Sequence, residues 1–130
     1  MNISGWIQFA DLSFRDLGAV DAHSATRHFR DFDWPSEFAR QNQLSADDIE
    51  QCDPQIGLSD KTGRYINIHP FPGNEGYFYF QYFIRLRVLG VPLWKVRRIV
   101  RGNDLNVDHI PDLIYEFCAG QDEKLASRAA

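Results

Sequence analysis

The sequence is poor in the features that mark membrane, secreted and zinc-binding proteins. No run approaches the roughly 20 apolar residues that a membrane-spanning helix needs, and the N-terminus lacks the basic and then apolar pattern of a signal peptide. The only two cysteines, Cys52 and Cys118, lie far apart and outside any Cys-x-x-Cys spacing, which argues against a disulfide framework or a zinc site. We therefore expect a cytoplasmic protein without membrane contact, in which both cysteines are buried free thiols.

Motifs for catalysis and for phosphate binding are also missing. The chain has no Gly-x-Ser-x-Gly, Ser-x-x-Lys, Gly-x-Gly-x-x-Gly or Walker pattern. His23 and His28 are five residues apart, which on a helix separates them by about 140 degrees, too far to share one metal ion. We expect no metal, no cofactor and no enzymatic activity, although distant residues such as His69, Asp60 and Arg64 could still assemble a site.

Size and composition indicate one globular domain. The chain has 130 residues, of which 44% are hydrophobic and 25% charged, close to the averages for globular proteins. We expect residues 1–120 to form this domain and residues 121–130, which are rich in alanine and charge, to form a flexible tail.

The first half of the chain predicts helices. Apolar residues at steps of three and four predict a helix from Asp21 to about Trp34, where Pro35 disfavours its continuation. Pro35 suits the first turn of a second, short helix. Ser45 is a typical N-cap, so we expect a third helix from there to about Asp53.

The middle of the chain predicts strands. Weak alternation over 5–10 indicates a first strand, and the segments 55–59 and 64–71 flank a turn in which Gly63 can adopt a positive φ. Aromatic residues and a period of two favour a strand over 77–88, with the even positions apolar up to Val88. The fold class that we expect is α+β, with a small antiparallel β-meander of about three to four strands packed against helices that precede and follow it.

The last third of the chain predicts helices again. Pro92 begins a helix with an apolar stripe that includes Leu93, and Gly102 ends it; Asp108 begins the last helix. An alternative interpretation makes 81–89 helical too, which would create a helix-turn-helix-like pair with the helix that starts at Pro92.

Charge is distributed unevenly along the chain. Residues 1–60 carry 11 acidic and 4 basic side chains, whereas residues 61–130 carry 7 acidic and 10 basic ones. No acidic residue lies between Gly76 and Asn103, the part of the chain that contains most of these cations. This basic segment is the clearest electrostatic signal in the sequence.

Two surfaces are candidates for binding a partner. Aromatic and arginine side chains, the types that dominate binding hot spots, share the outward face of the 77–88 strand. That candidate surface consists of Tyr77, Tyr79, Phe83, Arg85 and Arg87. The second surface is acidic and consists of Asp47, Asp48, Glu50, Asp53 and Asp60.

These observations predict a non-enzymatic protein-binding module with one protein partner. The most specific form of the hypothesis is a bacterial inhibitor or toxin-neutralising protein of the immunity type, which blocks a toxin or enzyme by surface complementarity. One alternative is a nucleic-acid-binding regulator that uses the basic 85–101 segment. Its phosphate contacts would be Lys95, Arg97, Arg98 and Arg101. A second alternative is a small-molecule-binding domain with an aromatic pocket.

Overall fold

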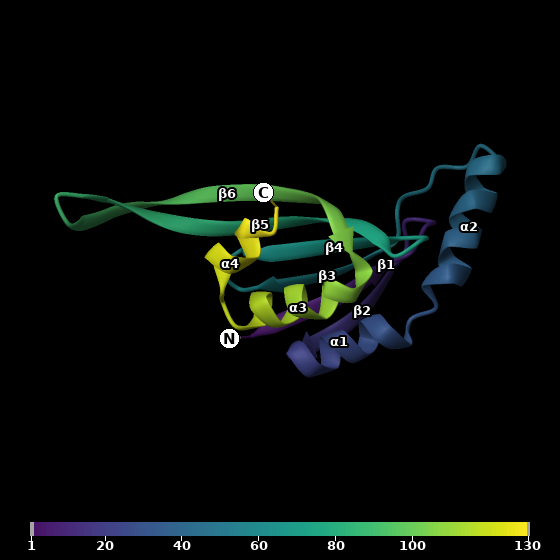
Figure 1. Cartoon of the computed structure of the whole chain (residues 1–130), viewed down its shortest axis with the longest axis horizontal. Helices are drawn as coiled ribbons and strands as arrows, with labels where there is room; N and C mark the ends of the chain where they lie inside the picture. Colours follow the sequence, from purple (N-terminus) through teal and green to yellow (C-terminus); the bar gives the residue numbers. More distant parts are fainter. Residues whose placement is uncertain (1, 130) are drawn as a thin grey trace.

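The computed structural model describes residues 2–129, apart from the side chains of residues 88 and 92–94. The described residues form a six-stranded antiparallel sheet in the order β2-β1-β3-β4-β5-β6, together with four α-helices (Figure 1). The strands are β1 (Ile3–Gln8), β2 (Phe14–Val20), β3 (Gln55–Asp60), β4 (Tyr65–Phe71), β5 (Glu75–Val88) and β6 (Val91–Asn106). The helices are α1 (Ala22–Asp31), α2 (Trp34–Ala46), α3 (Ile110–Cys118) and α4 (Asp122–Ser127), with a short 3₁₀ turn at Val107–His109.

The core lies between one face of the sheet and the helices α1, α3 and α4. Alternate residues of β1, β3, β4 and the first part of β5 point to this face, and the large apolar ones that form the core are at most 4% exposed. Phe117 of α3 meets Phe80 of β5 edge to face. We call this the helix-side face of the sheet, and the opposite one, which no helix among residues 2–129 covers, the helix-free face. The strand residues of the core are Ile3, Ile7, Ile56, Leu58, Ile66, Ile68, Phe78 and Phe80.

The α+β class is confirmed, but the prediction of a small meander of three to four strands is wrong. The sheet has six strands because β2 and β6 extend it at its two edges. The sequence of β2 contains Gly18 at a positive φ and has no buried residue, so it lacks the alternation that marks a half-buried strand. No helix among the described residues is long and apolar enough to cross a membrane.

The helix predicted from Pro92 to Arg101 is also wrong, and with it the helix-turn-helix alternative. Residues 91–106 are strand β6, which pairs with β5 along its whole length. Leu89 and Gly90 have φ values of 55° and 81°, and Val88 pairs with Val91, so these two residues form a tight hairpin turn with positive φ at both positions. The side chains of Val88 and Leu93 lie outside the described residues.

The early helices differ from the prediction in their boundaries. Asp21 and Ser24 cap α1 reciprocally, and Asp33 caps α2, with Pro35 in its first turn as expected. The predicted third helix from Ser45 is absent because α2 continues through Ser45 to Ala46. The residues of α2 before Ser45 are compatible with a helix. A serine, although a typical N-cap residue, does not by itself interrupt a helix that has already formed.

The remaining predicted elements are present. The strands expected over 5–10, 55–59, 64–71 and 77–88 correspond to β1, β3, β4 and β5, and the last helix is α3. Residues 122–127, within the segment expected to be a flexible tail, form α4 and bury Leu125 completely.

A buried ion-pair network joins the β3–β4 hairpin to the C-terminal helices. Arg64 donates to Asp60 at 2.7 Å, to Asp122 at 2.5 Å and to the backbone oxygen of Phe117 at 3.1 Å. Its guanidinium also lies 4.4 Å from the centre of the Phe117 ring. The side chain of Arg64 is 9% exposed and that of Asp60 is 2% exposed, so each charge depends on the other for compensation.

We predict that Arg64→Met lowers the free energy of unfolding by about 3 kcal/mol, because it leaves two carboxylates without their cation. Urea denaturation at neutral pH measures this loss. The control is Arg40→Met, at an arginine whose side chain is 48% exposed. It removes an ion pair to Asp11 and a longer contact of 3.8 Å to Glu37, and should cost less than about 1 kcal/mol. Equal losses in the two variants would contradict the buried network.

Candidate functional site

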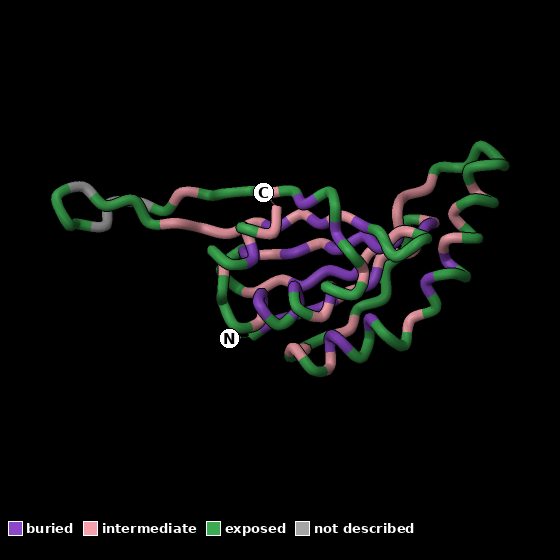
Figure 2. Tube along the Cα trace, in the orientation of Figure 1, coloured by how far each residue is buried: buried purple, intermediate pink, exposed green. Residues whose placement is uncertain are grey.

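Strands β5 and β6 extend beyond the rest of the sheet as a two-stranded arm. The pairing of β4 with β5 ends at Tyr65 and Gln81, whereas β5 and β6 continue to pair as far as Val88 and Val91. We call residues 82–98 the arm. It projects well past the helices (Figure 1), and none of its described side chains is buried, in contrast to the body of the molecule (Figure 2).

The register gives the arm two chemically different faces. Ile84 lies opposite Val96, and Leu86 is two residues further along β5, so it points to the same side as Ile84. These three apolar side chains therefore continue the helix-side face. No helix among the described residues lies over the outer part of the arm (Figure 1). Leu86 is 40% exposed, whereas Ile84 and Val96 are half-buried. At the tip, Leu89 is 99% exposed. The arm therefore offers an uncovered apolar strip.

The helix-free face of the arm is cationic. Arg85 lies directly opposite Lys95, and Phe83 lies opposite Arg97. The nitrogen Nζ of Lys95 lies 4.6 Å from the centre of the Phe83 ring. Like charges directly opposite each other destabilise a strand pair, so Arg85 and Lys95 weaken the arm.

The cations of the arm have no acidic partner in the part of the chain that the structure describes. Exposed side chains of five basic residues lie on the arm, and none of them forms an ion pair there. These residues are Arg85, Arg87, Lys95, Arg97 and Arg98. The arm thus combines uncompensated positive charge with uncovered apolar surface.

Tyr77 and Tyr79, the other members of the predicted partner surface, lie outside the arm, in the part of β5 that pairs with β4. Arg101 of β6 lies 4.7 Å from the Tyr77 ring and 5.0 Å from the Tyr79 ring, and it donates to the Tyr79 hydroxyl. Both tyrosines are partly buried. The structure therefore brings the five predicted residues of β5 onto one face and adds Lys95, Arg97 and Arg101 to them.

A loop covers the far end of the helix-free face. The Tyr77 hydroxyl donates to Asp53 at 2.8 Å, and the Tyr77 ring stacks on His69 at 4.3 Å. Burial raises the pKa of Tyr77 and lowers the pKa of His69 to about 4, so His69 is neutral at physiological pH. Asp53 and His69 are therefore structural partners of Tyr77.

The predicted acidic surface is only partly assembled. Asp47, Asp48 and Glu50 are exposed at the end of α2, at the opposite end of the molecule from the arm. Asp53 is engaged by Tyr77, and Asp60 is held by Arg64. Three of the five residues remain together as a small acidic cluster.

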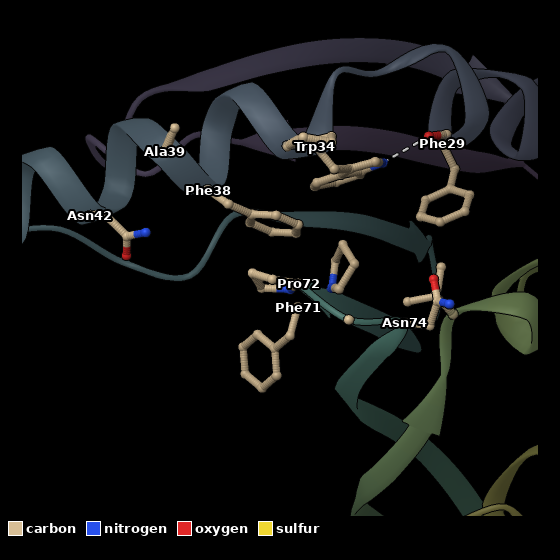
Figure 3. A pocket seen from close by; sticks show the side chains of 12 residues that line it. Phe29, Trp34, Phe38, Ala39, Asn42, Phe71, Pro72 and Asn74 are labelled. Carbon is tan, nitrogen blue, oxygen red and sulfur yellow. Dashed lines mark hydrogen bonds between the residues drawn. The ribbon is translucent and has the colours of Figure 1, made fainter.

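An apolar pocket of about 560 Å³ lies between α2 and the β4–β5 turn (Figure 3). Its volume falls in the range of small-molecule sites. Asn42 and Asn74 supply the polar side chains, and no charged side chain lines it. The apolar lining consists of Phe29, Trp34, Pro35, Phe38, Ala39, Pro70, Phe71, Pro72, Gly73 and Val107.

The described residues contain neither a group arranged for metal binding nor a thiol with a lowered pKa. No group of three or more His, Cys, Asp or Glu side chains in residues 2–129 is arranged to hold a metal ion. Burial raises the pKa of Cys118 to about 11 and also raises that of Cys52, which keeps both thiols protonated.

Comparison of the chain with known protein families, with curated proteins and with solved structures gives no match.

Sequence reasoning missed the role of β6. Residues 95–97 alternate between charged and apolar as in a strand, but Arg98 breaks the alternation. The apolar residues Val96, Ile99 and Val100 then fit the spacing of a helical stripe, which is why the sequence predicts a helix here. The signal that could have found it is the pair Leu89-Gly90 between two runs rich in β-branched and aromatic residues, which is typical of a hairpin.

We predict that burial of neutral His69 makes the protein less stable in mild acid. Because the pKa of His69 in the folded protein is about 4, below the 6.5 of an unfolded chain, only the unfolded state binds this proton as the pH falls from 6.5 to 4. The free energy of unfolding should fall over this window by up to about 3 kcal/mol. Chemical denaturation at several pH values measures the fall.

The fall should be smaller in His69→Gln than in the wild type. His28→Gln, at an exposed position on α1, serves as the control and should retain the full pH dependence. If His69→Gln lost stability with falling pH as steeply as the wild type, the assignment of the effect to His69 would be wrong.

Proposed function

We propose that the chain is a non-enzymatic protein-binding module that holds one protein partner with the arm. The observation that carries this proposal is the arm itself, a two-stranded ribbon with an uncovered apolar strip and opposed like charges. An isolated two-stranded hairpin is marginally stable in water, and these like charges weaken it further. A partner that covers the strip and supplies carboxylates would bury the exposed apolar side chains and neutralise the opposed like charges.

The pattern of exposed apolar residues supports the same proposal. Of the eight large hydrophobic residues exposed among those described, four lie on or beside the arm. Such apolar side chains, together with arginine and aromatic neighbours, form the central contacts of many protein interfaces. The four residues are Leu86, Leu89, Val91 and Ile99.

An inhibitor of the immunity type is the specific form of this proposal. Such a protein acts by occupying a surface of a toxin or enzyme, which requires complementarity and no catalytic group. A projecting arm is suited to enter a groove on the partner, and uncompensated charge speeds the encounter with a groove of opposite sign.

We predict that a native pull-down recovers one stoichiometric protein partner and that Leu86→Asp abolishes the recovery, because a carboxylate would lie buried in the apolar contact. The matched control is Leu12→Asp in the β1–β2 turn, where the leucine is 37% exposed, compared with 40% for Leu86. Leu12→Asp should leave the recovery unchanged. Recovery of general chaperones alone, or equal recovery by both variants, would count against the proposal.

Binding of nucleic acid is a second candidate, favoured by the width and charge of the arm. A two-stranded ribbon fits the major groove of DNA, and the cations of β6 would contact phosphates. The residues concerned are Lys95, Arg97, Arg98 and Arg101, the same ones expected from the sequence, now carried by a strand instead of a helix.

For this second function we predict salt-dependent retention on a DNA column. Lys95→Gln should lower the slope of log affinity against log salt concentration by about 1, as expected for the loss of one phosphate contact. Lys61→Gln, at an exposed lysine in the β3–β4 turn, is the control and should leave the slope unchanged. Lack of retention at low salt would exclude this candidate.

A further inference from the structure

Strand β6 is a free edge of the sheet. It ends the strand order, and its residues pair with β5 on one side only. Among the described residues no other segment forms backbone hydrogen bonds with residues 91–106. Over the arm, this edge projects beyond α4, so a second strand can approach it (Figure 1). An edge of this kind is a template for adding a strand from another chain.

Over residues 95–97 the side chains along this edge alternate in character. The alternation ends there, because Arg98 lies on the helix-side face and Ile99 lies on the helix-free face. Lys95 and Arg97 point to the helix-free face, and Val96, between them, points to the helix-side face. A strand added beside β6 would place its own side chains on the same two faces. Acidic residues on one face and apolar residues on the other would match both.

This charge pattern excludes a second copy of the chain as the added strand. Two β6 edges side by side would bring the lysine and three arginines of each strand together, and like charges across strands are destabilising. Lysine and arginine on an edge are a common protection against self-pairing. The edge of β6 therefore favours pairing with an acidic strand over pairing with β6 of a second copy of the chain.

We infer that β6 is the docking edge for an extended segment of the partner that carries acidic and apolar side chains in alternation. This inference rests on the proposed protein-binding function and names the chemistry of the partner. The segment would extend the sheet by a seventh strand. Its carboxylates would lie beside Lys95 and Arg97, and its apolar side chains would lie beside Val96.

The test uses the full chain and three nine-residue peptides. The first alternates glutamate and valine, the second has the same composition in two blocks, and the third has lysine in place of glutamate. Titration followed by NMR gives the affinities, and amide hydrogen exchange identifies the protected residues. We expect the alternating acidic peptide to bind at least tenfold more tightly than the block peptide and to protect amides of residues 95–99.

A charge swap makes the test specific. The double variant Lys95→Glu/Arg97→Glu should lose at least tenfold in affinity for the acidic peptide and gain binding of the lysine peptide. The control, Lys61→Glu/Lys124→Glu, reverses two exposed lysines outside the arm and should retain the preference of the wild type. Thermal unfolding of both variants verifies that they are folded.

Three outcomes would overturn the inference: equal binding of the alternating and block peptides, no amide protection in β6, or displacement of the peptide by single-stranded DNA with the same protection pattern. If no peptide binds but the pull-down still recovers a partner that the Leu86→Asp variant loses, strand addition is wrong and the proposed protein-binding function stands. If neither the peptides nor a Leu86-dependent partner binds, the proposed function fails as well.

Discussion

The unequal length of neighbouring strands is the constraint on which the other features of this protein depend. Strand β4 has 7 residues, whereas β5 has 14 and β6 has 16, so the last two strands must leave the sheet together. A strand pair without a third strand or a covering helix cannot bury its apolar side chains. The alternation that fills the core at Phe78 and Phe80 therefore continues outward into an apolar strip in which Ile84 is half-buried and Leu86 is exposed.

The same geometry separates charge within the molecule. The arm carries positive charge at one end, and the exposed acidic residues after α2 lie at the other end (Figure 1). The distance between these ends prevents the basic segment from being neutralised by the acidic half of its own chain. The net charge of −4 is thus a poor guide to what the arm attracts, because a partner approaching the arm encounters a locally cationic surface.

The elements with strong local signals could be predicted from the sequence. The helix α3 and the strands β3, β4 and β5 have clear periods and boundary residues. Strand β6 could not be assigned with the same logic, because its sequence also fits a helical stripe, formed by Leu93, Val96, Ile99 and Val100. Residues 91–106 form a strand instead of a helix because they pair with β5 along their whole length. Local propensity does not include such cross-strand pairing.

The part of the candidate site on β5 could be predicted from the sequence, whereas the part on β6 could not, because it depends on cross-strand pairing. The aromatic and arginine residues of β5 follow from its period of two, which places Tyr79, Phe83 and Arg85 on one face. Their neighbours Lys95 and Arg97 become part of the same surface only through the register of the hairpin. The engagement of Asp53 within the body could not be foreseen either, because its partner Tyr77 lies 24 residues away along the chain.

Stability and binding are assigned to different parts of this molecule. The buried network around Arg64 and the packing of α3 on the sheet hold the body together, and of the arm only Tyr82, its first residue, packs against this core. Substitutions at Leu86, Lys95 or Arg97 therefore alter exposed side chains that contribute little to the core. A protein whose stability required the arm would not tolerate Arg85 directly opposite Lys95, so this like-charge pair is better explained by the chemistry of a partner than by the needs of the fold.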